Sequence, residues 1–354
     1  MIIFNKYEKY GDYHWKDYAR GDNDYALHVD HIVEWIGADT YLLDVGAGDG
    51  LIASRFSNCI GVDDNLMAIS LAAQHDVDIW SGSAYSIPIL NKQMRAVLFG
   101  DVLEHLEFPG KALLEARRVL DDSGSLYIAV PPLEGEVSEY HYREYTEQTL
   151  KESVELFGFA LEGEIKNANG RLYARFSKVP LKIGIGGGRL RHNDGYINID
   201  ICDPADIKHD CNNLPLPFED DSVDRVYSSH CLEHLDKPMD LIRDLARVCR
   251  TGATIEIKVP YYAAEMANMM GHKCSISLQE IRNVTIHFPK DFWRGDRRIV
   301  LTHHALVPSE ALAQAKDELP FLEGLDDQVI MRWVQGTCHE ICYYFQVVEN
   351  EFAK

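Results

Sequence analysis

The chain has 354 residues, 56 of them acidic and 35 basic, and a formal net charge of −21 at pH 7. This length suits two domains of ordinary size, and the acidity disfavours a nucleic acid as partner, because binding phosphates needs a basic surface. No apolar run approaches the ~20 residues that a bilayer requires, so we expect no membrane span. The amino terminus lacks the apolar core of a signal peptide, which favours a cytoplasmic location.

The first predicted strand runs directly into closely spaced glycines. Residues 41–50 read Tyr-Leu-Leu-Asp-Val-Gly-Ala-Gly-Asp-Gly, so Gly46, Gly48 and Gly50 follow the strand and Asp44 precedes them. Glycines let the backbone turn sharply and approach a ligand closely. The spacing differs from the G-x-G-x-x-G fingerprint of dinucleotide sites, and a carboxylate there would repel a pyrophosphate but attract an ammonium group. The loop therefore disfavours an NAD-dependent dehydrogenase.

This Asp-x-Gly-x-Gly-x-Gly pattern resembles motif I of the class I S-adenosylmethionine-dependent methyltransferases. The resemblance implies an α/β, Rossmann-like fold and S-adenosylmethionine as cofactor, with S-adenosylhomocysteine as product. A second strand, residues 59–63, ends in Asp63 and is followed by Asp64. Asp63 matches the acid that receives the ribose hydroxyls in this family, and a carboxylate can accept two hydrogen bonds from a diol. We therefore assign Asp44, Gly46, Gly48, Gly50, Asp63 and Asp64 to cofactor binding.

Two further segments of the first half resemble the cofactor-lining segments of the family. Residues 81–88 resemble the stretch after the third strand, where an Asp commonly faces the adenine; Ser83 stands in its place, followed by Ala84. Residues 100–105 resemble the stretch after the fourth strand, which implies that Asp101 lies near the cofactor. A helix cap is the alternative role for Asp101.

Residues 141–146, His-Tyr-Arg-Glu-Tyr-Thr, resemble the H-x-R-x-Y-T stretch of the ubiquinone/menaquinone-type methyltransferases. The segment from 159 to 178, which turns at Asn169-Gly170, predicts the antiparallel hairpin that ends this fold. The candidate general bases, needed only where the acceptor must lose a proton, are His105 and His141 in the first half and His234 and His272 in the second. The alternative for His105 is a structural role in tying down the backbone.

Aromatic residues crowd the segment before the first strand. They are Tyr7, Tyr10, Tyr13, Trp15 and Tyr18. The family resemblance implies an aromatic lid over the cofactor, whereas packing against the domain surface is the alternative. The eight cysteines include no Cys-x-x-Cys pair, so we expect buried, reduced thiols and no metal site.

The second half repeats the first. Leu103-Glu104-His105-Leu106 recurs as Leu232-Glu233-His234-Leu235, and Val130-Pro131 recurs as Val259-Pro260, both at an offset of 129 residues. Around each copy the pattern predicts a strand, an amphipathic helix and another strand, which is a βαβ unit with parallel strands.

Upstream of its copy, the second half has its own glycine loop and resembles a group of largely uncharacterised methyltransferase-like proteins. The residues assigned to the cofactor there are Gly184, Gly186, Asp200 and Asp210. Asp210 occupies the adenine-facing position at which the first half has Ser83. Aligning the glycines places Lys182 where the first half has Asp44. The second half is shorter by about nine residues before the repeat, which we interpret as a loop deletion that leaves the order of elements intact.

We therefore expect two domains, residues 1–179 and 180–354, the second with an insertion at 261–333. Each should hold a mostly parallel seven-stranded sheet with a C-terminal antiparallel hairpin. The predicted function is methyl transfer to an oxygen or nitrogen of a small molecule or carbohydrate, with the chemistry in the first domain. The second domain is either a second active site or a degenerate copy, and a homo-oligomer is possible. The alternatives are a nucleic-acid or protein methyltransferase and a non-catalytic cofactor-binding or scaffolding protein.

Overall fold

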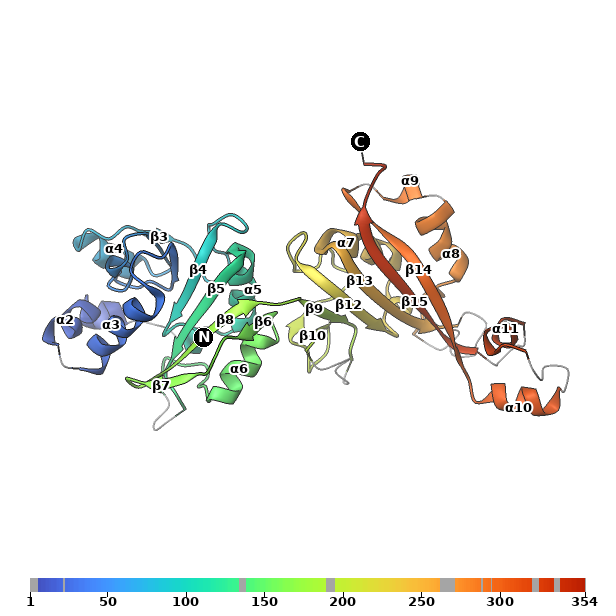
Figure 1. The fold of residues 1–354 in the computed structure, drawn as a ribbon, viewed down its shortest axis with the longest axis horizontal. Helices are drawn as coiled ribbons and strands as arrows, with labels where there is room; N and C mark the ends of the chain where they lie inside the picture. The colour runs from blue at the N-terminus through green and yellow to red at the C-terminus, as the bar shows by residue number, and fades with distance from the viewer. Residues whose placement is uncertain are drawn as a thin grey trace. The chain divides into compact units, whose positions relative to one another are not determined.

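The computed structural model describes residues 6–21, 23–133, 138–188, 195–261, 271–287, 289–293, 295–319, 325–333 and 338–353. Contacts divide the chain into two compact units, Met1–Val179 and Pro180–Lys354 (Figure 1). We call them unit 1 and unit 2 and describe each by itself.

Unit 1 is built on an eight-stranded sheet with the order β3-β2-β1-β4-β5-β8-β6, and β7 pairs with β8. The strands are β1 (Leu42–Val45), β2 (Cys59–Asp63), β3 (Ile79–Ser81), β4 (Met94–Gly100), β5 (Leu120–Val130), β6 (Phe159–Leu161), β7 (Lys166–Ala168) and β8 (Arg171–Lys178). The helices are α1 (Lys6–Tyr10), α2 (Tyr13–Arg20), α3 (Asp24–Ile36), α4 (Leu66–Gln74), α5 (Pro109–Val119) and α6 (Glu147–Glu155), with short 3-10 turns η1 (Ala53–Arg55) and η2 (Leu103–His105).

The α/β fold predicted from the sequence is confirmed, with one strand more than expected in unit 1. Strands β1 to β5 are parallel, and β8 runs antiparallel to β5, β6 and β7. The additional strand is β7, which pairs with β8 across Asn169 and Gly170. Both residues have positive φ angles, 50° and 69°, as a tight Asn-Gly hairpin turn requires.

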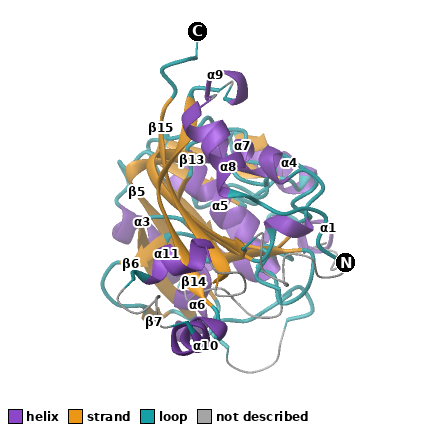
Figure 2. Cartoon of the chain, turned by 90° about the vertical axis from the view of Figure 1, so that its right-hand side faces the viewer, coloured by secondary structure: helices purple, strands orange, loops and turns teal. Residues whose placement is uncertain are grey.

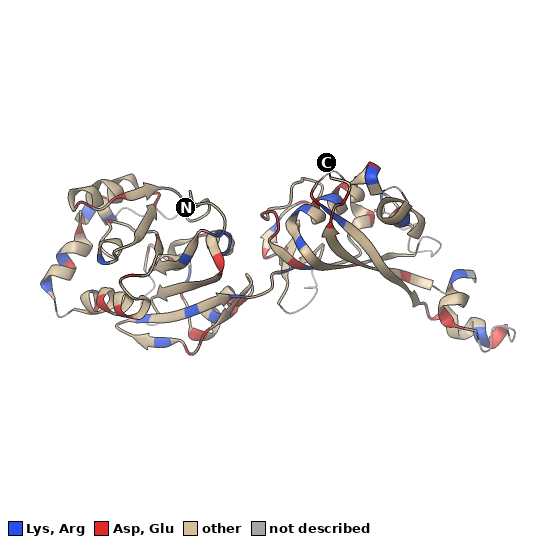
Figure 3. Cartoon of the chain, turned by 45° about the horizontal axis from the view of Figure 1, so that its top comes forward, with Lys and Arg blue, Asp and Glu red and all other residues tan. Residues whose placement is uncertain are grey.

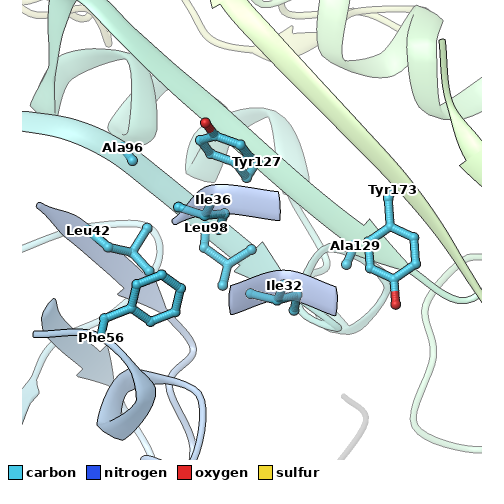
Figure 4. Packing of buried hydrophobic residues seen from close by; sticks show 9 residues of the cluster. All are labelled: Ile32, Ile36, Leu42, Phe56, Ala96, Leu98, Tyr127, Ala129 and Tyr173. Atoms are coloured by element: carbon cyan, nitrogen blue, oxygen red, sulfur yellow. The ribbon is translucent and has the colours of Figure 1, made fainter. Parts of the chain in front are cut away.

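One core of unit 1 lies between α3 and the sheet (Figure 4). Helix α3 begins at the cap residue Asn23, whose side chain accepts a hydrogen bond from Ala26 N, and it buries Val29, Ile32 and Ile36 at helical spacing. Tyr173 of β8 is buried against the same face. Burying each large apolar side chain contributes about 1.5–3 kcal/mol, so this packing fixes the sheet whose strand ends carry the site.

Unit 2 is built on a seven-stranded sheet with the order β11-β10-β9-β12-β13-β15-β14. The strands are β9 (Lys182–Ile185), β10 (Ile197–Asp200), β11 (Ile207–Lys208), β12 (Val223–Ser229), β13 (Cys249–Pro260), β14 (Arg297–Pro308) and β15 (Cys338–Glu349). The helices are α7 (Pro238–Val248), α8 (Leu278–Arg282), α9 (Pro289–Phe292), α10 (Ala311–Glu318) and α11 (Asp327–Trp333), with a 3-10 turn η3 (Leu232–His234) and a π-helical turn η5 (Asn283–His287). The longest strands of this unit, with 12 residues each, are β13, β14 and β15, which are labelled in Figure 2.

Two expectations for unit 2 are wrong. The shortening removes an element, because the fully described residues 201–206 between β10 and β11 form no helix, whereas α4 joins β2 to β3 in unit 1. Six residues that include Pro204 are too few for a helix of stable length. The segment 261–333 is also not simply an insertion. It contains β14, the outer strand of the antiparallel pair with β15; residues 262–270, 288, 294 and 320–324 of it lie outside the described part.

Candidate active site

The glycine loop of unit 1 adopts a backbone that favours glycine at Gly46, Gly48 and Gly50, all of which have positive φ angles. Gly46 and Gly48 have φ angles of 75° and 57°, in the left-handed region that favours glycine. A Cβ at Gly46 would lie 2.5 Å from Val102 Cγ2, and one at Gly48 would lie 2.1 Å from the Tyr7 hydroxyl. Gly48 N donates a hydrogen bond of 2.8 Å to Asp63 Oδ2, so the loop is held against the end of β2.

The loop forms one wall of an open cavity of about 1010 Å³. This volume reaches the upper end of the roughly 300–1,000 Å³ that small-molecule sites occupy, so the cavity can hold a cofactor together with an acceptor. Nine of the residues proposed from the sequence line it: Asp44, Gly46, Gly48, Asp63, Asp64, Ala84, Asp101, His105 and His141. Gly50 and Ser83 are not among the described lining residues, and the Ser83 hydroxyl accepts a hydrogen bond from Tyr85 N in its own turn.

Asp44 is a buried carboxylate that faces this cavity. Its exposed fraction is 2%, and its Oδ2 has no hydrogen-bond partner among the residues that the structure describes. Burial, assisted by the nearby Asp63, raises the pKa of Asp44 to about 7. A buried carboxylate oxygen without a partner is costly, so this position favours a cationic ligand group.

Asp63 has the opposite environment, because its carboxylate is already hydrogen-bonded. Besides Gly48 N, it accepts a hydrogen bond of 2.8 Å from Asn65 N. Burial nevertheless raises its pKa above the ordinary value. A carboxylate offers about four acceptor positions, so Asp63 can still accept two hydrogen bonds from a diol.

Asp101 is positioned by Arg171, a residue that the sequence did not indicate. The guanidinium donates from Nε and Nη2 to the carboxylate, with an Nη2–Oδ2 distance of 2.8 Å. Burial acts to raise the pKa of Asp101, but His28 and Arg171 together outweigh it and hold the pKa below its ordinary value. Asp101 is therefore an ionised residue that lines the cavity. Its carboxylate accepts hydrogen bonds from Arg171 and caps no helix in the described part of the chain.

The two candidate histidines lie together on the same wall. The ring centroids of His105 and His141 are 4.9 Å apart at an angle of 71°. His105 Nδ1 lies 2.8 Å from the Tyr140 carbonyl oxygen, so His105 ties down the backbone as well as lining the cavity. Burial lowers the pKa of His105 to about 4 and also lowers that of His141, which leaves both imidazoles neutral at pH 7.

The amino-terminal aromatic segment covers the glycine loop. Tyr7, Tyr13 and His14 line the cavity. His14 Nδ1 lies 3.0 Å from Asp49 Oδ1, and Trp15 Nε1 donates a hydrogen bond of 2.8 Å to the Asp49 carbonyl. Asp49 thus attaches this segment to the loop, a role that the sequence analysis missed.

Unit 2 repeats the loop geometry with different glycines. Gly186 and Gly188 have φ angles of 70° and 57°, nearly those of Gly46 and Gly48. Gly188 N donates a hydrogen bond of 2.7 Å to Asp200 Oδ2, and Cys202 N donates to Oδ1. Asp200 is therefore the counterpart of Asp63.

The sheet register corrects the position assigned to Lys182. In unit 1, Asp44 lies opposite Leu98 of β4; in unit 2, Gly184 lies opposite Tyr227 of β12. Leu98 and Tyr227 are related by the repeat offset of 129 residues. The counterpart of Asp44 is therefore Gly184, and Lys182 lies two residues earlier in the strand. Unit 2 has no carboxylate at this position.

The side chain of Asp210 in unit 2 forms its hydrogen bonds within its own turn. Its carboxylate accepts hydrogen bonds from Asn212 N and from the side chains of Asn212 and Asn213. Asn213 N donates to the Asp210 carbonyl, as Ser86 N does to the Ser83 carbonyl. Ser83 and Asp210 are equivalent, and each holds its turn.

The parallel sheets, the glycine loops and the acids that end the second strands define an S-adenosylmethionine-dependent methyltransferase fold. The family model of the methyltransferase domain matches the chain twice, at residues 43–128 and 181–257. One match lies in each unit, so the chain contains two regions of this family, in line with two class I methyltransferase domains.

The chain is also similar to individual proteins. It is 26% identical over 130 residues to the uncharacterized protein MJ1123 of Methanocaldococcus jannaschii, covering 36% of this chain and 61% of that protein. It is 46% identical over 44 residues to ajmaline N-methyltransferase of Rauvolfia serpentina, covering 12% of this chain and 15% of that enzyme. The matches thus span less than two thirds of either relative.

Among solved structures, one similar protein is a methyltransferase of Thermotoga maritima described as a possible histamine N-methyltransferase. It is 16% identical and matches 50% of this chain and 100% of its own, with a TM-score of 0.44. Another is a TehB-like methyltransferase of Corynebacterium glutamicum, 20% identical over 48% of this chain and 97% of its own, with a TM-score of 0.38. Within the described part of the chain, no helix has the length and apolar character to cross a membrane.

Proposed function

We propose that unit 1 transfers the methyl group of S-adenosylmethionine to an oxygen or nitrogen of a small molecule or carbohydrate. The observation that carries this proposal is the Oδ2 atom of Asp44, which lies beside the glycine loop and has no hydrogen-bond partner in the part of the chain that the structure describes. Asp44 would bind the ammonium group of the cofactor, and Asp63 would accept its ribose hydroxyls. When bound, S-adenosylmethionine supplies an electrophilic methyl group on its sulfonium.

The acceptor would bind on the side of the cavity lined by Asp101, His105 and His141. Methyl transfer is an in-line displacement, so positioning and exclusion of water contribute much of the acceleration. The aromatic segment of α1 and α2 would keep water out. His105 and His141 are neutral imidazoles at pH 7, so either can accept a proton from an acceptor hydroxyl or ammonium.

The charge of the cavity favours an acceptor that is cationic or uncharged. Its described lining includes eight acidic residues but only Lys6 and Arg171 as strong bases. Acidic and basic residues are also interspersed along the elements of both units (Figure 3). A nucleic acid would meet more carboxylates than cations here, so we place amines and alcohols ahead of nucleic acids as acceptors.

Unit 2 is the weaker candidate for the chemistry. It has Gly184 in place of Asp44, and the exposed Ile201 follows Asp200 where Asp64 follows Asp63. Unit 2 would therefore bind the cofactor weakly or not at all. The alternative, a second working site, rests on its intact loop and Asp200.

The test is release of S-adenosylhomocysteine by the full chain, measured with a panel of amine, alcohol and sugar acceptors. We expect turnover that Asp63→Ala abolishes and Asp200→Ala leaves in place. Turnover that follows Asp200 instead would assign the chemistry to unit 2. Turnover with nucleic acid or protein alone would overturn the proposed acceptor class, and no release with any acceptor would support the non-catalytic alternative.

A further inference from the structure

Each unit brings one glutamate and two histidines together at the same point of the fold. In unit 1 they are Glu104 and His105 of η2 and His141 of the loop after β5. One ligand atom from each of the three lies within 4.8 Å of the others. Unit 2 has the same arrangement: the ligand atoms lie within 4.8 Å of one another and belong to Glu233 and His234 of η3 and to His272 of the loop after β13. We call these sets the Glu-His-His triads.

The two triads share their internal geometry. The histidine rings are 4.9 Å apart at 71° in unit 1 and 4.8 Å apart at 77° in unit 2. In both units the residue after the second histidine donates its backbone N–H to the carbonyl of the triad glutamate, at 2.8 Å. The second histidines are offset by 131 residues rather than 129, within segments that otherwise differ in sequence. The chain thus builds one arrangement twice from different surroundings.

The first histidine of each triad is oriented as metal-binding histidines are. His105 Nδ1 lies 2.8 Å from the Tyr140 carbonyl oxygen, and His234 Nδ1 lies 3.0 Å from that of Gly271. A carbonyl oxygen can only accept, so Nδ1 carries the proton and Nε2 carries the lone pair. A backbone carbonyl on one ring nitrogen is a common way of fixing the tautomer whose other nitrogen binds a metal.

The glutamates supply a buried carboxylate in each triad. Glu104 and Glu233 are each 1% exposed. The Oε2 atoms of both glutamates and Nδ1 of His141 have no hydrogen-bond partner among the described residues. In unit 2, His230 contacts the other carboxylate oxygen of Glu233 at 3.2 Å. Buried carboxylates are generally paired or bound to a metal, and Oε2 lacks such a partner in both triads.

Cofactor binding does not account for the triads. Unit 2 lacks the counterparts of Asp44 and Asp64 but keeps every member of its triad. Asp101 and Arg171, which flank the triad in unit 1, are replaced by His230 and Glu340 in unit 2. These two form an ion pair of 2.8 Å with the charges reversed. The ion pair beside the triad thus differs between the two units, whereas the three potential metal ligands are the same.

We propose that each triad binds one divalent transition-metal cation through two imidazole nitrogens and one carboxylate oxygen. Two histidines and a glutamate match the ligand set of zinc sites that retain an open position, and imidazole favours transition metals over magnesium or calcium. Metal–ligand distances of about 2.0–2.2 Å require these ligand atoms, which lie within 4.8 Å of one another, to move closer together. In unit 1 all three ligands line the cavity, so the open positions of the metal face the acceptor side. A bound metal would occupy the imidazole nitrogens that can accept a proton in the metal-free protein.

The experiment is titration of the metal-free full chain with Co²⁺, whose visible absorption reports its ligands. We expect two equivalents for the wild type. His141→Ala should lose one, His272→Ala the other, and the double variant both. His303→Ala removes an exposed histidine outside the triads and should keep two. Metal binding is read without cofactor or acceptor, so its outcome is separate from that of methyl transfer.

Folding of each variant is checked by far-ultraviolet circular dichroism. Glu104→Gln and Glu233→Gln, which keep the side-chain shape but remove the charge, serve as a second pair if a histidine variant fails to fold. They too should lose one equivalent each. No saturable Co²⁺ binding, or two equivalents retained in the variants, would overturn the proposal.

Discussion

Asp44→Asn tests the electrostatic role of the cofactor loop, because it should raise the unfolding free energy of the unliganded protein and lower its affinity for the cofactor. Burial raises the pKa of Asp44 from 3.8 to about 7, which corresponds to about 4 kcal/mol of cost for ionising it in the folded state. The folded state therefore binds more protons than the unfolded state between these two pH values. Stability falls as pH rises through this window, and the full cost is present above pH 7.

The size of the effect follows from two opposing contributions. Asparagine removes the buried charge but leaves an amide that is itself without partners, at a cost of about 1–3 kcal/mol. We expect a net stabilisation of about 2 kcal/mol at pH 8, or roughly 4–8 °C in the melting temperature of unit 1. At pH 5, where Asp44 of the wild type is protonated, the advantage should disappear.

Binding should change in the opposite direction. Loss of a charge-assisted hydrogen bond of about 1.5–3 kcal/mol to the cofactor ammonium predicts roughly 10- to 150-fold weaker binding at pH 8. In the wild type, affinity should fall as pH drops below 7, because Asp44 must release its proton to bind the cation, and Asp44→Asn should flatten this dependence. Calorimetric titration with S-adenosylhomocysteine and scanning calorimetry at pH 5 and 8 measure both quantities.

The control is Asp78→Asn, which neutralises an exposed aspartate of the same unit and should alter neither property. A variant that is less stable than the wild type at both pH values would refute the electrostatic reasoning. Unchanged affinity at pH 8 would refute the assignment of Asp44 to the ammonium group.

Three other substitutions probe the walls of the cavity. Gly48→Ala and Gly188→Ala impose the same strain, with φ of 57° at both positions, but among described residues only Gly48 has a neighbour, Tyr7, with which the new Cβ would clash. Calorimetry should show cofactor binding reduced by Gly48→Ala alone, and equal effects would contradict the role of the aromatic cover. Arg171→Ala should destabilise unit 1 by about 2–4 kcal/mol in urea unfolding, since it leaves the half-buried Asp101 carboxylate without its partner. Arg95→Ala, which breaks an exposed pair with Asp121, should cost at most about 1 kcal/mol, and similar costs would contradict the importance of the Asp101 pair. Burial lowers the pKa of His28 to about 4, so its imidazole is neutral in the folded protein and the free energy of unfolding should fall as pH drops from 6.5 toward 4. His28→Gln should remove that part of the pH dependence, and an unchanged dependence of the unfolding free energy on pH would show that His28 does not cause it.

Local signals in the sequence carried much of the fold and of the unit 1 site. The glycine loop, Asp44 and Asp63 lie within twenty residues of one another, and a strand followed by glycines has few possible geometries. The Asn169-Gly170 turn was predictable for the same reason. The family resemblance added Asp101 and Ala84, and both line the cavity.

The features that were missed depend on contacts between distant residues. Arg171 reaches Asp101 across 70 positions, and Asp49 meets His14 and Trp15 across more than thirty. No local pattern marks such pairs. Lys182 was misplaced because the spacing of glycines does not determine strand register, which depends on the pairing of β9 with β12.

The correspondence between the two triads was obscured by a shift of two residues in their second histidines. His141 and His272 stand at an offset of 131, and their neighbours share no pattern. A search for single repeated histidines near the offset of 129 would have found the pair. The missing counterpart of α4 had a signal too, since Pro204 lies within the six residues that join β10 to β11.

Calorimetric titration of the full chain with S-adenosylhomocysteine tests most directly whether unit 1 holds the cofactor site. We expect one equivalent, lost in Asp63→Ala and retained in Asp200→Ala, because only unit 1 joins the glycine loop to a buried carboxylate at the position of Asp44. Absence of binding at high micromolar ligand, or one equivalent that Asp200→Ala removes and Asp63→Ala leaves, would contradict this assignment.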